Sequence, residues 1–241
     1  MTTLQIATKD LSHMLAMHGA IVPKRCTVPI LSHVLLDGGR IVSTDLDIRL
    51  ATAVNGANDL RATLPLHALA IPKSANGTTE LAVDLKPTTG CRNGSIPELV
   101  SDGTATLAVA GVTRRIVLGV ANDFPMAAAD KAFDSVGTIG AADLRSLLEF
   151  TAPAMSTNAV RYYLNGILVA PHPIDDKATA WVATDGHRMH IATGPTLAIG
   201  ANCILPFPAV KWLLKFLPKA GAVEISRESH VKSGPIGAIP F

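Results

Sequence analysis

The chain has 241 residues, 48% of them hydrophobic, and a formal net charge of +2. This composition supplies a buried core for one or two domains and excludes a disordered or strongly basic protein, so a nucleic-acid-binding surface has to be local. The sequence contains no signal peptide and no run of about 18 apolar residues, which predicts a soluble cytoplasmic protein. The 3 cysteines lack C-x-x-C spacing, which argues against a disulfide framework or a zinc ribbon.

The first half of the chain predicts a helix, several strands and a second helix. Residues 8–20 place Leu11, Met14, Leu15 and His18 at helical spacing. Residues 28–54 indicate a strand, a Gly-Gly turn and a strand. A Leu-Pro pair opens a second helical pattern at 64–75, and the alternating "TELAVDL" then predicts a strand.

The second half repeats this order. A helical pattern at 141–152 is followed by predicted strands at 160–170 and 180–194. Another Leu-Pro pair opens a helix within 205–221, and "AVEIS" predicts the next strand. The two halves therefore share one succession of elements.

The spacing between equivalent residues is nearly constant along the chain. It is 133, 140 and 141 residues for the pairs Leu11 and Leu144, Thr44 and Thr184, and Pro65 and Pro206. This predicts two tandem duplicated domains, 1–135 and 136–241, divided near the small and polar residues 134–138. Few helices among many strands indicate an α+β class, with two helices per domain packed on antiparallel sheets.

Four segments carry a resemblance to a known family. "CTVPILSHVLL", "STDLDIRL", "VRYYLNGILVA" and "VATDGHRMHIATG" resemble the bacterial DNA polymerase III β subunit, the replicative sliding clamp. The resemblance implies a DNA clamp fold in a ring around duplex DNA, with no catalytic chemistry and no cofactor. It also implies DNA polymerase and clamp-loader subunits as partners, held through linear peptide motifs.

The chain departs from that family in its length. Family members carry three such domains, and this sequence resembles the first two. We expect the last strand of the second domain to be cut short at "HVKSGPIGAIPF". We expect either a truncated form or a short relative that assembles differently. Three copies of a two-domain chain could close a six-domain homo-oligomeric ring.

A lysine series marks the last predicted helix. Lys211, Lys215 and Lys219 follow at i, i+4 spacing, which predicts one basic face on a continuous helix. Spacing alone favours an ordinary solvated face. Lysines of this kind suit contacts with phosphates that ignore base sequence, and the resemblance implies that this face meets DNA.

Further DNA contacts follow from the resemblance. They lie in the loop "VPKRCTVP" and in the segment before "LNG": Lys24, Arg25, Asn158, Arg161, Tyr162 and Tyr163. Solvent exposure for the arginine and packing at a strand start for the tyrosines are the structural alternatives. The "LPFP" at the helix start replaces a basic pair that is usual in the family, so we expect low DNA affinity.

The resemblance also implies one wall of a hydrophobic cleft that binds peptides. Its residues are Leu164, Thr184, Gly186, His187, Arg188 and Met189. The opposite wall belongs to the linker and the third domain in the family, so we expect weak or no peptide capture.

A metal-dependent hydrolase is the alternative function. Asp185, His187 and His190 are close in sequence, and Asp45 with Asp47 form a second acidic pair. A strand would place i and i+2 residues on one face, which would allow Asp185 and His187 to chelate a metal, but His190 would then lie on the other face.

Overall fold

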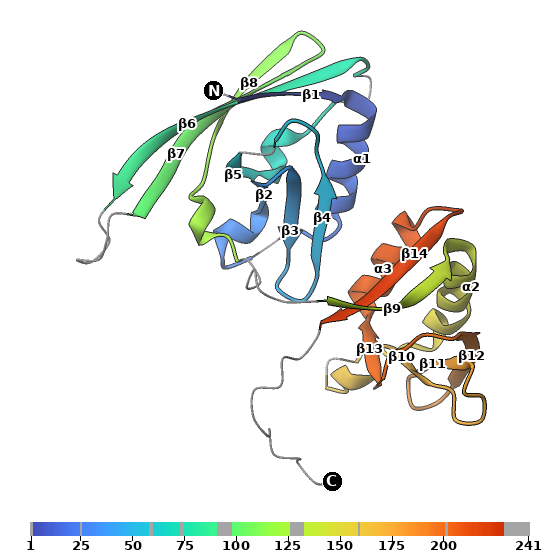
Figure 1. Cartoon of the computed structure of the whole chain (residues 1–241). Helices are drawn as coiled ribbons and strands as arrows, with labels where there is room; N and C mark the ends of the chain where they lie inside the picture. The colour runs from blue at the N-terminus through green and yellow to red at the C-terminus, as the bar shows by residue number, and fades with distance from the viewer. Residues whose placement is uncertain are drawn as a thin grey trace. The chain divides into compact units, whose positions relative to one another are not determined.

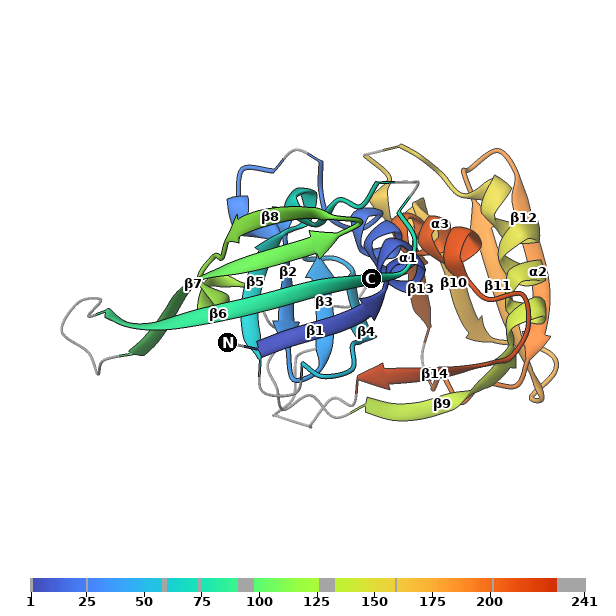
Figure 2. The same cartoon turned by 90° about the horizontal axis from the view of Figure 1, so that it is seen from above.

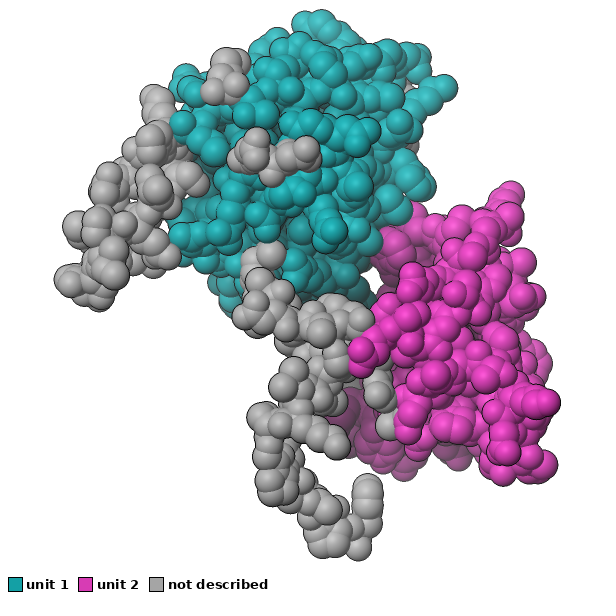
Figure 3. All heavy atoms as spheres, in the orientation of Figure 1, with its two compact units in different colours: residues 1–126 teal, residues 127–241 magenta. Residues whose placement is uncertain are grey.

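The chain forms two compact units, Met1–Met126 and Ala127–Phe241, coloured separately in Figure 3. The computed structural model describes residues 2–24, 26–57, 60–72, 75–90, 98–125, 133–158, 160–200 and 202–228. No helix in these ranges is long and apolar enough to cross a membrane.

The described residues of unit 1 form one α-helix and two antiparallel sheets (Figure 1). The helix is α1 (Thr8–Gly19), and the strands are β1 (Thr2–Ala7), β2 (His33–Asp37), β3 (Arg40–Thr44), β4 (Arg49–Ala53), β5 (Arg61–Pro65), β6 (Thr78–Gly90), β7 (Glu98–Val109) and β8 (Val112–Val117). The short 3₁₀ turns are η1 (Pro29–Ser32), η2 (Leu66–Leu69) and η3 (Ala121–Asp123). The strand orders are β1-β6-β7-β8 and β4-β3-β2-β5, and the long β6–β7 pair stands out in Figure 2.

Unit 2 repeats this plan. Its elements are β9 (Phe133–Gly140), α2 (Ala141–Thr151), η4 (Ala152–Ala154), η5 (Tyr162–Leu164), β10 (Gly166–Pro171), β11 (Ala178–Thr184), β12 (Met189–Pro195), β13 (Cys203–Pro206), α3 (Phe207–Phe216) and β14 (Ala222–Glu228). The sheet β12-β11-β10-β13 has the same connectivity as β4-β3-β2-β5, and β14 pairs with β9 as β6 pairs with β1. The predicted duplication and the α+β class are therefore confirmed.

The predicted second helix of the first domain is wrong. Only η2 forms there, and Ala70 adopts an extended ψ of 129° directly after it. Ile71 precedes Pro72, and the residue before a proline disfavours the helical region, so this segment has room for a single turn. In unit 2 the equivalent segment has Pro208 in the first turn, where a helix tolerates proline, and no further proline until Pro218, so α3 extends over 10 residues.

The predicted domain boundary falls within a strand. Residues 134–138 belong to β9, which pairs with β14, so the polar residues that resemble a linker are part of a sheet. The end of the second domain, including the strand expected to be cut short, lies outside the described residues.

Each unit has its own apolar core, formed by side chains from its helices and its strands. In unit 1 the fully buried side chains include Leu4, Val34 and Leu64. In unit 2 Ile139, Leu148 and Val210 hold the equivalent place, with α2 and α3 packed beside each other. The helical spacing in the sequence thus identifies the core faces of α1 and α2.

Candidate functional site

The segment "TDGHR" forms a tight turn between β11 and β12, not a strand. The Thr184 hydroxyl donates to the Arg188 carbonyl at 2.8 Å and accepts from the Gly186 N–H at 3.1 Å. The backbone N–H groups of His187 and Arg188 both donate to Asp185 Oδ1, at 2.9 and 3.0 Å. Gly186 has a φ of +91°, which a residue without Cβ adopts at little cost.

Asp185 is therefore committed to its own turn. Its other oxygen, Oδ2, receives Arg188 Nε at 3.0 Å. The two backbone N–H donors, from His187 and then Arg188, hold the pKa of the Asp185 carboxyl below its ordinary value, and the Arg188 charge adds to this. The carboxylate charge stabilises the turn rather than standing ready for a metal.

The metal-hydrolase alternative is not supported by the geometry. The predicted chelating pair, Asp185 and His187, sits in a turn, so the strand geometry that the alternative needs is absent. His190 donates its Nδ1–H to the Phe150 carbonyl at 2.7 Å, and its ring packs 5.2 Å from the Phe150 ring. Within the described ranges, no three metal-ligating side chains come together.

Unit 1 contains the same turn at "TDLDI". Thr44 donates to the Ile48 carbonyl at 2.8 Å, and Asp45 Oδ1 accepts the N–H groups of Asp47 and Ile48 at 3.0 and 2.6 Å. Leu46 stands at the position of Gly186 with a φ of +83°. The shared structural role of the Thr-Asp pair is confirmed, and Asp45 and Asp47 are parts of a turn.

The loop before β10 presents aromatic side chains to solvent. Tyr162 and Tyr163 are 76% and 58% exposed, so they are not packed at a strand start, and their rings meet edge to face at 5.8 Å. Asn158 accepts the Val160 N–H at 2.9 Å through Oδ1, and its carbonyl accepts Asn165 Nδ2 at 3.1 Å. These bonds tie Asn158 to Val160 and Asn165.

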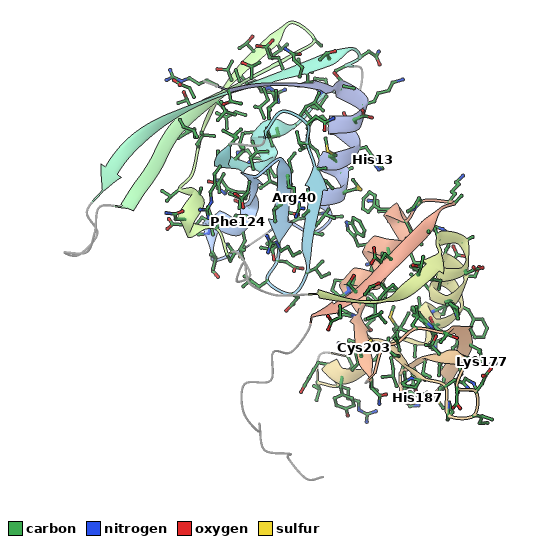
Figure 4. The ribbon with its side chains drawn as sticks, viewed as in Figure 1. His13, Arg40, Phe124, Lys177, His187 and Cys203 are labelled. Atoms are coloured by element: carbon green, nitrogen blue, oxygen red, sulfur yellow. The ribbon has the colours of Figure 1, made fainter. Side chains whose placement is uncertain are left out.

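Arg161 joins this loop to the turn. A Cβ on Gly186 would stand 3.0 Å from Arg161 Nη1, so the guanidinium lies directly against the glycine. The structure thus brings the predicted DNA-contact loop and the predicted cleft residues to one surface of unit 2. On that surface Leu164 and Thr184 are half-buried, whereas Met189 is 58% exposed. His187, labelled in Figure 4, is exposed beside them.

Only two of the three predicted lysines lie on α3. Lys211 and Lys215 are exposed on α3, and each ammonium lies over an aromatic ring, at 5.1 Å from the Phe207 centroid and 4.9 Å from the Phe216 centroid. Lys219 lies beyond the helix end. Leu217 precedes Pro218 and takes an extended ψ of 131°, which ends α3, so the prediction of three lysines on one continuous helix is wrong.

Two of the predicted contacts belong to unit 1. Lys24 is exposed, and Arg25 lies outside the described residues.

Arg145 holds the end of α3 and was missed in the sequence. It extends from α2 and donates to the carbonyls of Leu214 and Leu217 at 2.8 and 2.7 Å. Both carbonyls lie at the C-terminal end of α3, where no backbone N–H of the helix is available to bond them. Arg145 therefore caps the helix that carries Lys211 and Lys215. Its one sequence signal is a lone basic residue in the otherwise apolar and acidic helix "AADLRSLLEFT".

Comparisons with known proteins agree on one family. The model of the DNA polymerase III beta subunit central domain matches residues 138–231. The beta sliding clamp of Caulobacter vibrioides is 30% identical over 217 residues, which is 84% of this chain and 54% of the relative. The beta sliding clamp of Pseudomonas aeruginosa is 28% identical over 237 residues, covering 93% of this chain and 56% of the relative.

A solved structure shows the same fold. The sliding clamp of Bartonella birtlesii bound to griselimycin superposes with a TM-score of 0.73 at 26% identity, covering 95% of this chain and 60% of that chain. The chain thus spans little more than half the length of the curated relatives it matches.

Proposed function

The chain belongs to the DNA polymerase III β subunit family of sliding clamps, which is non-catalytic, and we propose that it is a clamp module that holds duplex DNA and partner proteins together. The module acts by binding alone, in the cytoplasm where the chromosome is replicated. The observation that carries the proposal is the single surface of unit 2 on which the Arg161 loop meets the "TDGHR" turn.

DNA contact through α3 is the first part of the proposal. Lys211 and Lys215 project from neighbouring turns of one helix, and Arg145 fixes the end of that helix. Ammonium groups on long stems follow a phosphate backbone without reading bases. Tyr162, Tyr163 and the loop residue Asn158 extend this contact, and Lys24, Arg25 and Lys219 contribute local charge.

Peptide capture is the second part. The turn and loop offer exposed apolar side chains such as Met189 and Tyr163, and the turn also carries the Arg188 guanidinium, which Asp185 orients at 3.0 Å. Such a surface suits a short apolar peptide with a polar group, of the kind that polymerase and clamp-loader subunits would carry. Capture by this one wall is predicted to be weak.

A trimer of this chain would supply six units for a ring, a prediction that sedimentation tests directly.

Charge reversal on α3 tests the DNA part. We expect Lys211→Glu with Lys215→Glu to weaken binding of a 20-bp duplex about tenfold at low salt, and to lower the slope of log K against log salt by about 2. Lys177→Glu is the matched control, because this exposed lysine lies in the β10–β11 hairpin of the same unit and is labelled in Figure 4. Fluorescence anisotropy measures both, and equal loss in the control and the double variant contradicts a role for α3.

A further inference from the structure

The outer face of one unit 1 sheet carries a row of side chains in direct register. Ala51 pairs with Val42, Val42 with Leu35, and Leu35 with Thr63, across all four strands. Directly paired residues point to the same face of a sheet. Val42, Leu35 and Thr63 are 2%, 0% and 0% exposed, so something covers this face.

The cover is a segment of unit 1 itself. Ala121 and Phe124 pack on Leu35 and Val42 in a small apolar cluster separate from the main core. Upstream, the Gly119 N–H donates to the Thr63 carbonyl at 3.1 Å, and a Cβ on Gly119 would stand 2.7 Å from Thr63 Oγ1. The segment after β8 therefore crosses the row closely and ends on a phenylalanine, labelled in Figure 4.

Unit 2 presents the same row without this cover. Ile191 pairs with Val182, Val182 with Leu168, and Leu168 with Ile204. Val182 lies 140 positions after Val42, the spacing that also relates Thr184 to Thr44. The row of unit 2 is the more apolar one, because isoleucines replace Ala51 and Thr63.

The unit 2 row is open to solvent. Ile191 and Ile204 are 56% and 52% exposed, and Leu168 and Val182 are only half-buried. None of the four belongs to the apolar clusters found among the described residues, and those residues include no counterpart of Ala121–Phe124. A contiguous apolar row across a whole sheet is a typical binding surface.

We propose that this row binds a short peptide segment of another polypeptide with the pattern Ala-x-x-Phe. The phenylalanine packs on Leu168 and Val182, as Phe124 packs on Leu35 and Val42 in unit 1. The edge strand β13 places Ile204 at the position of Thr63, whose carbonyl accepts a hydrogen bond from the covering segment. The row adjoins the candidate cleft, since Met189 is two residues from Ile191, but it shares no residue with it and does not depend on the proposed function.

A peptide of residues 118–125, "LGVANDFP", tests the site against the full chain. With a fluorescent label, its anisotropy should report saturable binding that weakens about tenfold or more when its phenylalanine is alanine. Ile191→Glu and Ile204→Glu should weaken binding similarly. Both side chains are already exposed, so the fold should tolerate the change. Ile174→Glu, at a residue 89% exposed in the hairpin loop, is the matched control and should leave binding unchanged.

Three results would overturn the proposal. The first is no binding, or equal binding by the row variants. The second is binding that appears only after deletion of residues 229–241, which would make a segment of this chain the occupant. The third is a dimer in sedimentation that Ile204→Glu dissociates, which would make a second copy the occupant.

Discussion

His18 makes the stability of unit 1 dependent on pH. The side chain is fully buried, with Nδ1 2.8 Å from Ser43 Oγ and Nε2 2.8 Å from Thr52 Oγ1. Burial lowers the pKa of His18 from 6.5 to about 4, because the charged form loses its hydration and gains no carboxylate from these two hydroxyl partners. The folded state therefore holds the neutral ring, whereas the unfolded chain takes up a proton below pH 6.5.

The sign and size follow from that difference. The contribution of His18 to stability is fully present above pH 6.5 and is lost as the pH falls towards 4. Linkage predicts a loss of about 2 kcal/mol at pH 5 and about 3 kcal/mol below pH 4, relative to pH 7.

Hydrogen exchange measures this loss locally. Amides of α1 and β3 report unit 1, and Trp181 fluorescence reports unit 2 as an internal control. His18→Gln should be less stable at pH 7 but should lose much less stability between pH 7 and 5. Parallel pH dependence in the variant and the parent protein would refute the reasoning.

Three further predictions concern the turns and the helix cap. Leu46→Gly should raise the stability of unit 1 by about 0.5 to 1 kcal/mol in thermal unfolding, because glycine relieves the φ of +83°; a loss of stability would contradict this. Gly186→Ala should destabilise the turn by about 1 kcal/mol, and the added Cβ should displace the Arg161 guanidinium. Titrations should then show weaker DNA or peptide binding, and unchanged binding would contradict a role for Arg161 in the site. Arg145→Met should lower the free energy of unfolding of unit 2 by about 2 kcal/mol, measured by Trp fluorescence, because the carbonyls of Leu214 and Leu217 lose their donor. The control Ser146→Ala changes an exposed position of α2 and should lower it far less.

The covered and open sheet rows show how equal local patterns acquire different roles. Leu35 and Leu168 both alternate with core-facing residues on equivalent strands, and nothing in their immediate sequence distinguishes them. Their exposure differs because Phe124, far away in sequence, packs on Leu35, whereas the described residues of unit 2 include no counterpart of Phe124 over Leu168. Cover of this kind depends on the path of a distant segment.

The sequence by itself determined the repeat, the hairpin at the Gly-Gly turn and the helix faces that join the cores, because periodicity and turn chemistry act over a few residues. Thr44 and Asp45 on one side, and Thr184 and Asp185 on the other, form the same hydrogen bonds in both units for that reason. Only the tertiary structure decided that Arg161 lies against Gly186 and that Arg145 caps α3. Both contacts join segments that are distant along the chain, and their geometry is set by packing, which no local pattern records.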